Sequence, residues 1–154
     1  NGGAAQTVSG TRQASIRSIR FEDQDGRQAD LLLSGHFARL FIEVQINEPI
    51  PELVVGFKIK DRLGNEMYGT NSFYMQQVQK NLQQGETLTY CYDLVVDLGP
   101  GNYSISVALH GGELHLNANY EWRDRAHVFK VVNTDMVPHF VGSAYLKPGL
   151  SVKR

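Results

Sequence analysis

The clearest pattern in the chain is an alternation of apolar and polar residues from Leu53 to Lys60. Successive side chains of a strand point to opposite faces of a sheet, so this two-residue period predicts a strand with one buried face. Residues 61–66 follow, where Gly64 and Asn65 can adopt the positive φ angles of a tight turn. With a second short strand expected over residues 67–70, the pattern predicts a β-hairpin.

Similar short segments recur along the rest of the chain. A first strand is expected over residues 15–21, where imperfect alternation indicates a β-bulge. The other expected strands are residues 31–33, 39–47, 87–96, 103–109, 126–132 and 143–152, the last at a sheet edge because it contains Pro148. Residues 73–84 are expected to form a loop. About nine short strands with almost no helix predict an all-β fold, an antiparallel β-sandwich.

Residues 98–103 have the form L-x-P-G-x-Y, the tyrosine-corner pattern of Greek-key sandwiches. In such a corner the hydroxyl of the tyrosine, here Tyr103, bonds back to nearby backbone. The strand that follows alternates, and its second face carries only small or polar side chains, namely Ser104, Ser106, Ala108 and His110. The pattern therefore indicates a Greek-key topology and one flat, polar sheet face that could receive a ligand.

Composition narrows the possible partners and the compartment. The chain of 154 residues is long enough for one domain with a sizeable core. Its 15 basic and 16 acidic residues give a net charge of −1, so nothing in the charge balance predicts a nucleic-acid partner. Cys91 is the only cysteine, which excludes an internal disulfide framework and favours a reducing compartment such as the cytoplasm.

The beginning of the chain differs in composition from the rest. Residues 1–14 are rich in small and polar residues, as a linker would be, and no run approaches the ~20 apolar residues of a membrane-spanning helix. We therefore expect a linker remnant over residues 1–14, from a preceding domain, and a binding domain over residues 15–154.

Motifs for catalysis, nucleotides or metals are missing from the sequence. It contains no G-x-x-x-x-G-K-[ST], G-x-G-x-x-G or G-x-S-x-G motif. His110 and His115 lack the companions that zinc motifs place at fixed spacing. We expect no catalytic residue, no metal and no cofactor, and hence a protein that is not an enzyme.

What remains is a set of aromatic, amide, imidazole and guanidinium side chains in two stretches. Sugar rings stack their C–H patches on aromatic rings, while their hydroxyls need planar donors and acceptors. The candidate carbohydrate-binding residues are Tyr68, Asn71, Tyr74, His115, Asn117, Tyr120, Trp122 and Arg123. The set predicts a glycan-binding surface.

Three alternatives stay open at this point. Single aromatic residues such as Tyr120 and Trp122 are commonly part of a core. The whole cluster could serve a structural sandwich that mediates dimerisation or protein docking. A sugar hydrolase would need carboxylates such as Glu113, Glu121 or Asp124 in suitable geometry.

Two stretches, VVGFKIKDRLGNEMYGTNS at residues 54–72 and LGPGNYSISVAL with NYEWRDRAHVFKV at residues 98–131, carry a family resemblance. They resemble the C-terminal carbohydrate-recognition domain of the ATP-binding subunit of ABC transporters that export O-antigen polysaccharide. The resemblance covers residues 15–132. The run from Gly56 to Asn71 is its most specific part, because the tyrosine corner occurs in many sandwiches.

This resemblance implies an immunoglobulin-like sandwich that forms a homodimer, with the C-terminal strand, residues 143–152, exchanged between protomers. It further implies an ATPase domain in the same chain, a transmembrane partner subunit and a place at the cytoplasmic face of the inner membrane. The expected function is non-catalytic binding of O-antigen polysaccharide, at its capped non-reducing end, to license export. An anionic cap would be met by Arg123, Arg125 and His115.

Overall fold

The protein folds as a two-layer β-sandwich. The computed structural model describes residues 6–112, 118–134 and 137–154, and within these ranges it contains ten strands and no helix. The strands are β1 (Thr7–Ser9), β2 (Ala14–Glu22), β3 (Leu31–Leu33), β4 (Phe37–Ile46), β5 (Ile50–Asp61), β6 (Glu66–Asn71), β7 (Gln79–Leu82), β8 (Thr87–Val95), β9 (Gly101–His110) and β10 (Asn119–Val132). The predicted all-β class is confirmed.

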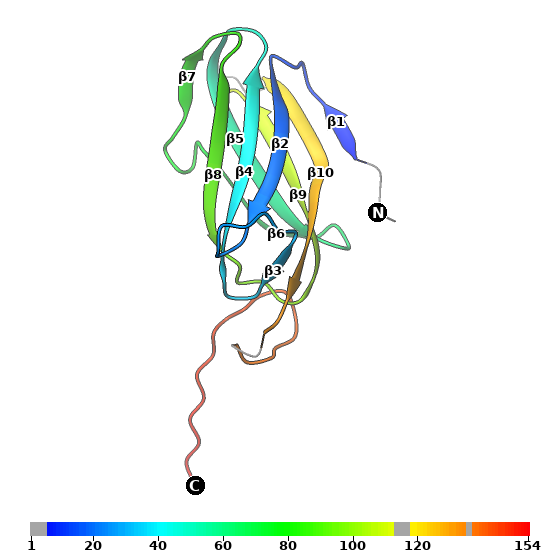
Figure 1. The fold of residues 1–154 in the computed structure, drawn as a ribbon, viewed down its shortest axis with the longest axis vertical. Helices are drawn as coiled ribbons and strands as arrows, with labels where there is room; N and C mark the ends of the chain where they lie inside the picture. The colour runs from blue at the N-terminus through cyan, green and yellow to red at the C-terminus, as the bar shows by residue number, and fades with distance from the viewer. Residues whose placement is uncertain (1–5, 113–117, 135–136) are drawn as a thin grey trace.

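The strands form two sheets that lie face to face (Figure 1). The larger sheet has seven strands in the order β1-β10-β9-β5-β6, with β3 beside β10 and β7 beside β5. The smaller sheet has the order β2-β4-β8. Among the strand pairs of the described residues, only β3–β10 is parallel. At one end of the sandwich the C-terminal segment leaves as an extended chain (Figure 1).

The core lies between the two sheets and is built from the alternating positions of their strands. Leu40 and Ile42 of β4 and Ile105 and Val107 of β9 belong to this core, and all four are 0% exposed. The predicted alternation of β4 and β8 is confirmed. In β9 the apolar face is buried as predicted, but Ser104 and Ser106 of the polar face are buried as well. In β5, however, Val54 and Gly56 are buried as well, because neighbouring strands and the Asn71 side chain cover its second face.

Several local predictions have clear outcomes. The β-bulge expected in the first strand lies between Ile16 and Ser18. In the expected turn Gly64 has φ 86°, whereas Asn65 does not adopt positive φ. Residues 73–84 are not entirely loop, because Gln79–Leu82 forms β7 against β5. The sequence missed β7 because its residues are mostly polar.

The two ends of the chain also differ from the simple strand pattern. Within the expected linker, residues 7–9 form β1 and pair with β10. The expected last strand is reduced to a single bridge between Ala144 and Leu98, and residues 145–154 contain no strand. The Tyr145 amide still donates to the Asp97 carbonyl at 3.0 Å, and residues 146–154 continue as an extended chain without strand pairing.

The tyrosine corner is confirmed. The hydroxyl of Tyr103 donates to the carbonyl oxygen of Gly99 at 2.7 Å, and burial raises the pKa of this hydroxyl. The bond closes the connection between the two sheets, which is the role that the sequence pattern predicts. Among the described residues no helix has the length and apolar character needed to cross a membrane.

Candidate functional site

The outward face of the larger sheet carries an aligned row of residues from four strands. Trp122 of β10 pairs with Ala108 of β9, which pairs with Gly56 of β5, which pairs with Asn71 of β6. Directly paired residues of antiparallel strands point to the same face. The row therefore places an indole and an amide at the two sides of a strip whose middle consists of small residues.

This row lies in a shallow depression of about 340 Å³, here called the outer groove. Its floor is formed by small residues of β5, β6 and β9, namely Gly56, Gly69, Ser106 and Ala108. Its walls include Lys58, Glu66, Asn71, Tyr74, His110 and Trp122. The outer groove thus combines a flat floor with two aromatic rings and several polar groups.

The floor is flat because close strand packing requires glycine there. A Cβ atom on Gly56 would lie 2.8 Å from the Cβ of Asn71, and one on Gly69 would lie 3.1 Å from Cγ of Lys58. Neither glycine has a positive φ, so space and not backbone conformation selects the residue. The two glycines consequently leave the bottom of the groove free of projecting side chains at these positions.

The turn after β6 positions Tyr74 at the rim. Asn71 Oδ1 accepts a hydrogen bond from the Tyr74 amide at 2.8 Å, and Ser72 Oγ accepts one from the Val55 amide at 2.9 Å. Ser72 is buried, so the second bond ties the turn to the core strand β5. The Tyr74 side chain itself is 70% exposed, which leaves its ring available to a ligand.

A polar group of three residues lies under Trp122. Asp124 Oδ1 accepts from Ser106 Oγ at 2.5 Å and from Lys60 Nζ at 3.1 Å. The bond from Ser106, together with Lys60, holds the pKa of the Asp124 carboxyl below its usual value. Lys60 Nζ also lies 5.8 Å from the centre of the Trp122 ring. Because Asp124 holds Lys60, the lysine is positioned for a cation–π interaction with the indole.

The remaining polar groups of the groove differ in their freedom to bind. Lys58 Nζ forms an exposed ion pair with Glu66 at 2.8 Å, and this lysine lowers the pKa of the Glu66 carboxyl. Nδ1 of His110 lies 2.6 Å from the Gly111 carbonyl oxygen. Since a carbonyl oxygen only accepts, Nδ1 is the donor in this contact, and Nε2 remains for a ligand.

The structure brings three of the sequence-predicted residues together in the outer groove: Asn71, Tyr74 and Trp122. Tyr68 pairs with Ile59 on the other face of the sheet, and its ring centre lies 6.1 Å from that of Phe57. Tyr120 is in the core, where its hydroxyl donates to the Glu52 carbonyl at 3.1 Å. His115 and Asn117 lie outside the described residues.

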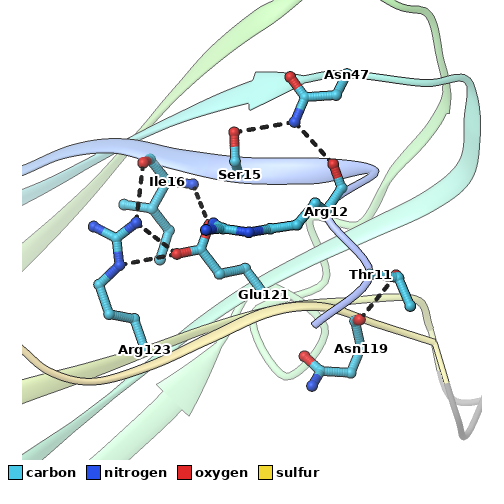
Figure 2. Close-up of polar contacts among 8 residues, drawn as sticks. All are labelled: Thr11, Arg12, Ser15, Ile16, Asn47, Asn119, Glu121 and Arg123. Carbon is cyan, nitrogen blue, oxygen red and sulfur yellow. Dashed lines mark hydrogen bonds and ion pairs between the residues drawn. The ribbon is translucent and has the colours of Figure 1, made fainter. Parts of the chain in front are cut away.

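Arg123 faces away from the groove into an ion-pair network. Its guanidinium contacts Glu121 at 2.6 Å, and Arg12 contacts the same carboxylate at 2.9 Å (Figure 2). Glu121 is 0% exposed, and Asp124 is held by Ser106 and Lys60. Neither carboxylate is free to act in the hydrolase geometry considered from the sequence, and Glu113 lies outside the described residues. The described part of the chain has no group of three or more potential metal ligands.

Sequence reasoning found part of this site and missed the rest. The alternation after the tyrosine corner pointed to Ser106, Ala108 and His110 as a polar face, and all three line the groove. Lys58 and Gly56 were not predicted as site residues, although they are two positions apart in β5 and therefore point to the same sheet face. This shared face, together with a glycine at the centre of a core strand, was the sequence signal that could have identified both residues.

Comparisons with known proteins agree with this architecture. The family model described as the Wzt C-terminal domain matches residues 5–146. No curated protein matches the chain. Among solved structures, the crystal structure of the C-terminal domain of Wzt is similar with a TM-score of 0.82 and 22% identity, covering 96% of this chain and 89% of that one. The family model spans nearly the whole sequence, and the chain therefore belongs to the Wzt C-terminal domain family.

Proposed function

We propose that this domain binds O-antigen polysaccharide in the outer groove, without catalysis, as part of an ABC transporter that exports the polymer. The observation that carries the proposal is the row from Trp122 across Ala108 and Gly56 to Asn71. It places an aromatic ring and an amide on either side of a floor without projecting side chains. Family membership supports the transporter context.

The chemistry of the groove suits a sugar ring. A pyranose can stack one apolar face on the Trp122 or Tyr74 ring, and its hydroxyls can bond to Asn71 Nδ2, His110 Nε2 and Lys58 Nζ. The groove is shallow and open, as suits one or two residues of a longer polymer. Lys58 is held by an exposed pair with Glu66, which an anionic group on the glycan can displace at small cost.

In this proposal the domain reports a finished polymer to the transporter. Recognition of a capped non-reducing end would license export, while ATP hydrolysis takes place in an ATPase domain of the same protein. That assembly, with a transmembrane partner subunit, would lie at the cytoplasmic face of the inner membrane. The isolated domain then needs only to bind glycan and to release it unchanged.

Trp122→Ala tests the site directly. A stacking ring contributes on the order of 1 kcal/mol to the binding free energy, so its removal should weaken binding of O-polysaccharide from the source strain about fivefold. Titration calorimetry with intact chains and with chains lacking the terminal residue measures both affinity and cap dependence. Tyr68→Ala is the matched control, because Tyr68 is also a partly exposed aromatic residue but lies on the other sheet face.

The two variants separate the possible results. Weaker binding in Trp122→Ala alone supports the outer groove. Weaker binding in Tyr68→Ala alone would move the site to the opposite face of the sheet. No binding by the unmodified domain would overturn the glycan proposal and favour a structural role for the sandwich.

We further propose that the domain forms a homodimer in which the C-terminal tail, residues 145–154, pairs with β8 of the second copy. Leu146, Leu150 and Val152 of the tail are 83%, 91% and 75% exposed. On its side away from β4, β8 has no partner strand among the described residues, and a depression of about 550 Å³ beside it is lined by Leu88, Tyr90 and Tyr92. Apolar tail residues and a free strand edge are complementary.

Deleting residues 146–154 is expected to convert this dimer into a monomer, because the deletion removes the pairing segment and its three exposed aliphatic side chains. Light scattering after size-exclusion chromatography measures the mass of both forms. A Leu31→Ser variant, which changes an exposed aliphatic residue elsewhere, serves as the control and should remain dimeric. A dimer that persists after the deletion would place the interface on another surface.

A further inference from the structure

The segment before the first core strand is firmly attached to the strand that carries Trp122. Residues 6–13, here called the N-terminal strap, contain β1, in which Ser9 pairs with Trp122 and Thr7 with Asp124. Beyond β1, the amide of Thr11 donates to the Asn119 carbonyl at 3.1 Å and the amide of Arg12 donates to the Tyr120 carbonyl at 2.8 Å. The strap therefore runs along β10 at the outer groove.

One buried carboxylate fastens this strap. Glu121 Oε1 accepts from the Ile16 amide at 2.9 Å and contacts Arg12 Nη1 at 2.9 Å, while Oε2 contacts Arg123 Nη2 at 2.6 Å (Figure 2). The carboxylate thus joins the strap, β2 and β10. Arg12 has φ 71°, an unfavourable conformation for a residue with a side chain, which surrounding contacts must hold in place.

The same part of β10 is irregular, and the irregularity sets the direction of Trp122. The β9–β10 register shifts between Asn119 and Glu121. Regular alternation would place Tyr120 and Trp122 on one face, but Tyr120 is in the core and Trp122 lines the outer groove. Glu121 lies between them, so its contacts with Arg12 and Ile16 are made next to this shift in the backbone.

We propose that Glu121 is a positioning residue for the outer groove, and that docking of the N-terminal strap through Arg12 is coupled to ligand binding at Trp122. The coupling to glycan rests on the function proposed above. Linkage makes it reciprocal: a docked strap raises glycan affinity, and bound glycan holds the strap more tightly. Both effects act through β10. One edge of this strand pairs with the strap, and its outward face carries the indole.

Arg12→Gln tests this coupling while leaving the buried Glu121–Arg123 pair in place. The Arg12 side chain is 53% exposed, so its replacement opens no cavity in the core. Trp122 is the only tryptophan, and its fluorescence therefore reports on the groove without any ligand. Acrylamide quenching, glycan affinity and hydrogen exchange of residues 7–13 are measured for the unmodified domain, Arg12→Gln, Arg12→Lys and Arg17→Gln. Arg17 is a similarly exposed arginine that pairs with Glu43 in the smaller sheet.

The proposal expects stronger quenching of Trp122 and about fivefold weaker glycan binding in Arg12→Gln, a factor at the low end of coupling between linked sites. Arg12→Lys should recover most of both, Arg17→Gln should match the unmodified domain, and glycan should slow exchange in residues 7–13. If Arg12→Gln has the same Trp122 quenching and glycan affinity as the unmodified domain and differs only in a lower melting temperature, the coupling is overturned. If the unmodified domain binds no glycan, the proposed function fails, and quenching alone decides whether the strap positions Trp122.

Discussion

Glu121→Gln is expected to lower the free energy of unfolding by about 3 kcal/mol, because removing one partner of a buried ion pair leaves charge without compensation. Glu121 is 0% exposed, and its two oxygens accept from Arg12, Arg123 and the Ile16 amide. A glutamine side chain has one oxygen and would turn its NH₂ group toward donors. Domains are typically stable by only about 5–15 kcal/mol, so the loss is a large share.

Urea denaturation of Glu121→Gln and of a matched Glu43→Gln variant measures this difference. Glu43 is partly exposed and lies 3.6 Å from Arg17, so its replacement should cost about 0.5 kcal/mol or less. Equal losses in the two variants would show that the Glu121 network contributes no more than a surface pair.

The second large effect is expected at Gly56, in the floor of the outer groove. Gly56→Ala should lower the unfolding free energy by about 2 kcal/mol, the usual cost of forcing an extra carbon into a packed site. The new Cβ would lie 2.8 Å from the Asn71 Cβ and 3.1 Å from the Thr70 carbonyl oxygen, so β6 must move away from β5. Since β6 leads directly into Tyr74, glycan binding should weaken in the same variant.

Gly101→Ala is the matched control for this prediction. Gly101 also lies in a strand of the larger sheet, but the nearest atom to an added Cβ is 3.7 Å away, an ordinary contact distance. Its stability and glycan affinity should therefore stay close to those of the unmodified domain. Denaturation and calorimetry on both variants check the two effects together. A Gly56→Ala variant that binds glycan normally would show that the floor is not part of the binding surface.

Most of the strands could be predicted from the sequence because their burial follows a local rule. In β4 the apolar residues at every second position all enter the core, and the proline-glycine corner before Tyr103 encodes its own hydrogen bond to Gly99. Strand β7 escaped prediction because its polar residues join the sheet through backbone pairing with β5. Backbone pairing of this kind does not depend on side-chain hydropathy, so the hydropathy pattern does not predict it.

The sequence predicted the types of residue in the candidate site, but not which of them lie together. Asn71, Tyr74 and Trp122 share one groove, whereas Tyr68 lies on the other face and Tyr120 in the core. Tyr68 and Asn71 are three residues apart in β6, so alternation itself puts them on opposite faces. Tyr120 and Trp122 are separated instead by the register shift between Asn119 and Glu121. Parity counted along the sequence cannot anticipate shifts of this kind.

The sequence by itself therefore determined the all-β class, the alternating core strands, the tyrosine corner and the family, because each depends on residues that are neighbours in the chain. Only the tertiary structure decided that the strap docks on β10, that Glu121 is buried between Arg12 and Arg123, and that Trp122 rather than Tyr120 faces the groove. The physical reason is that register, bulges and buried charge are set by contacts between distant strands. In an antiparallel sheet a shift of one residue exchanges the two faces.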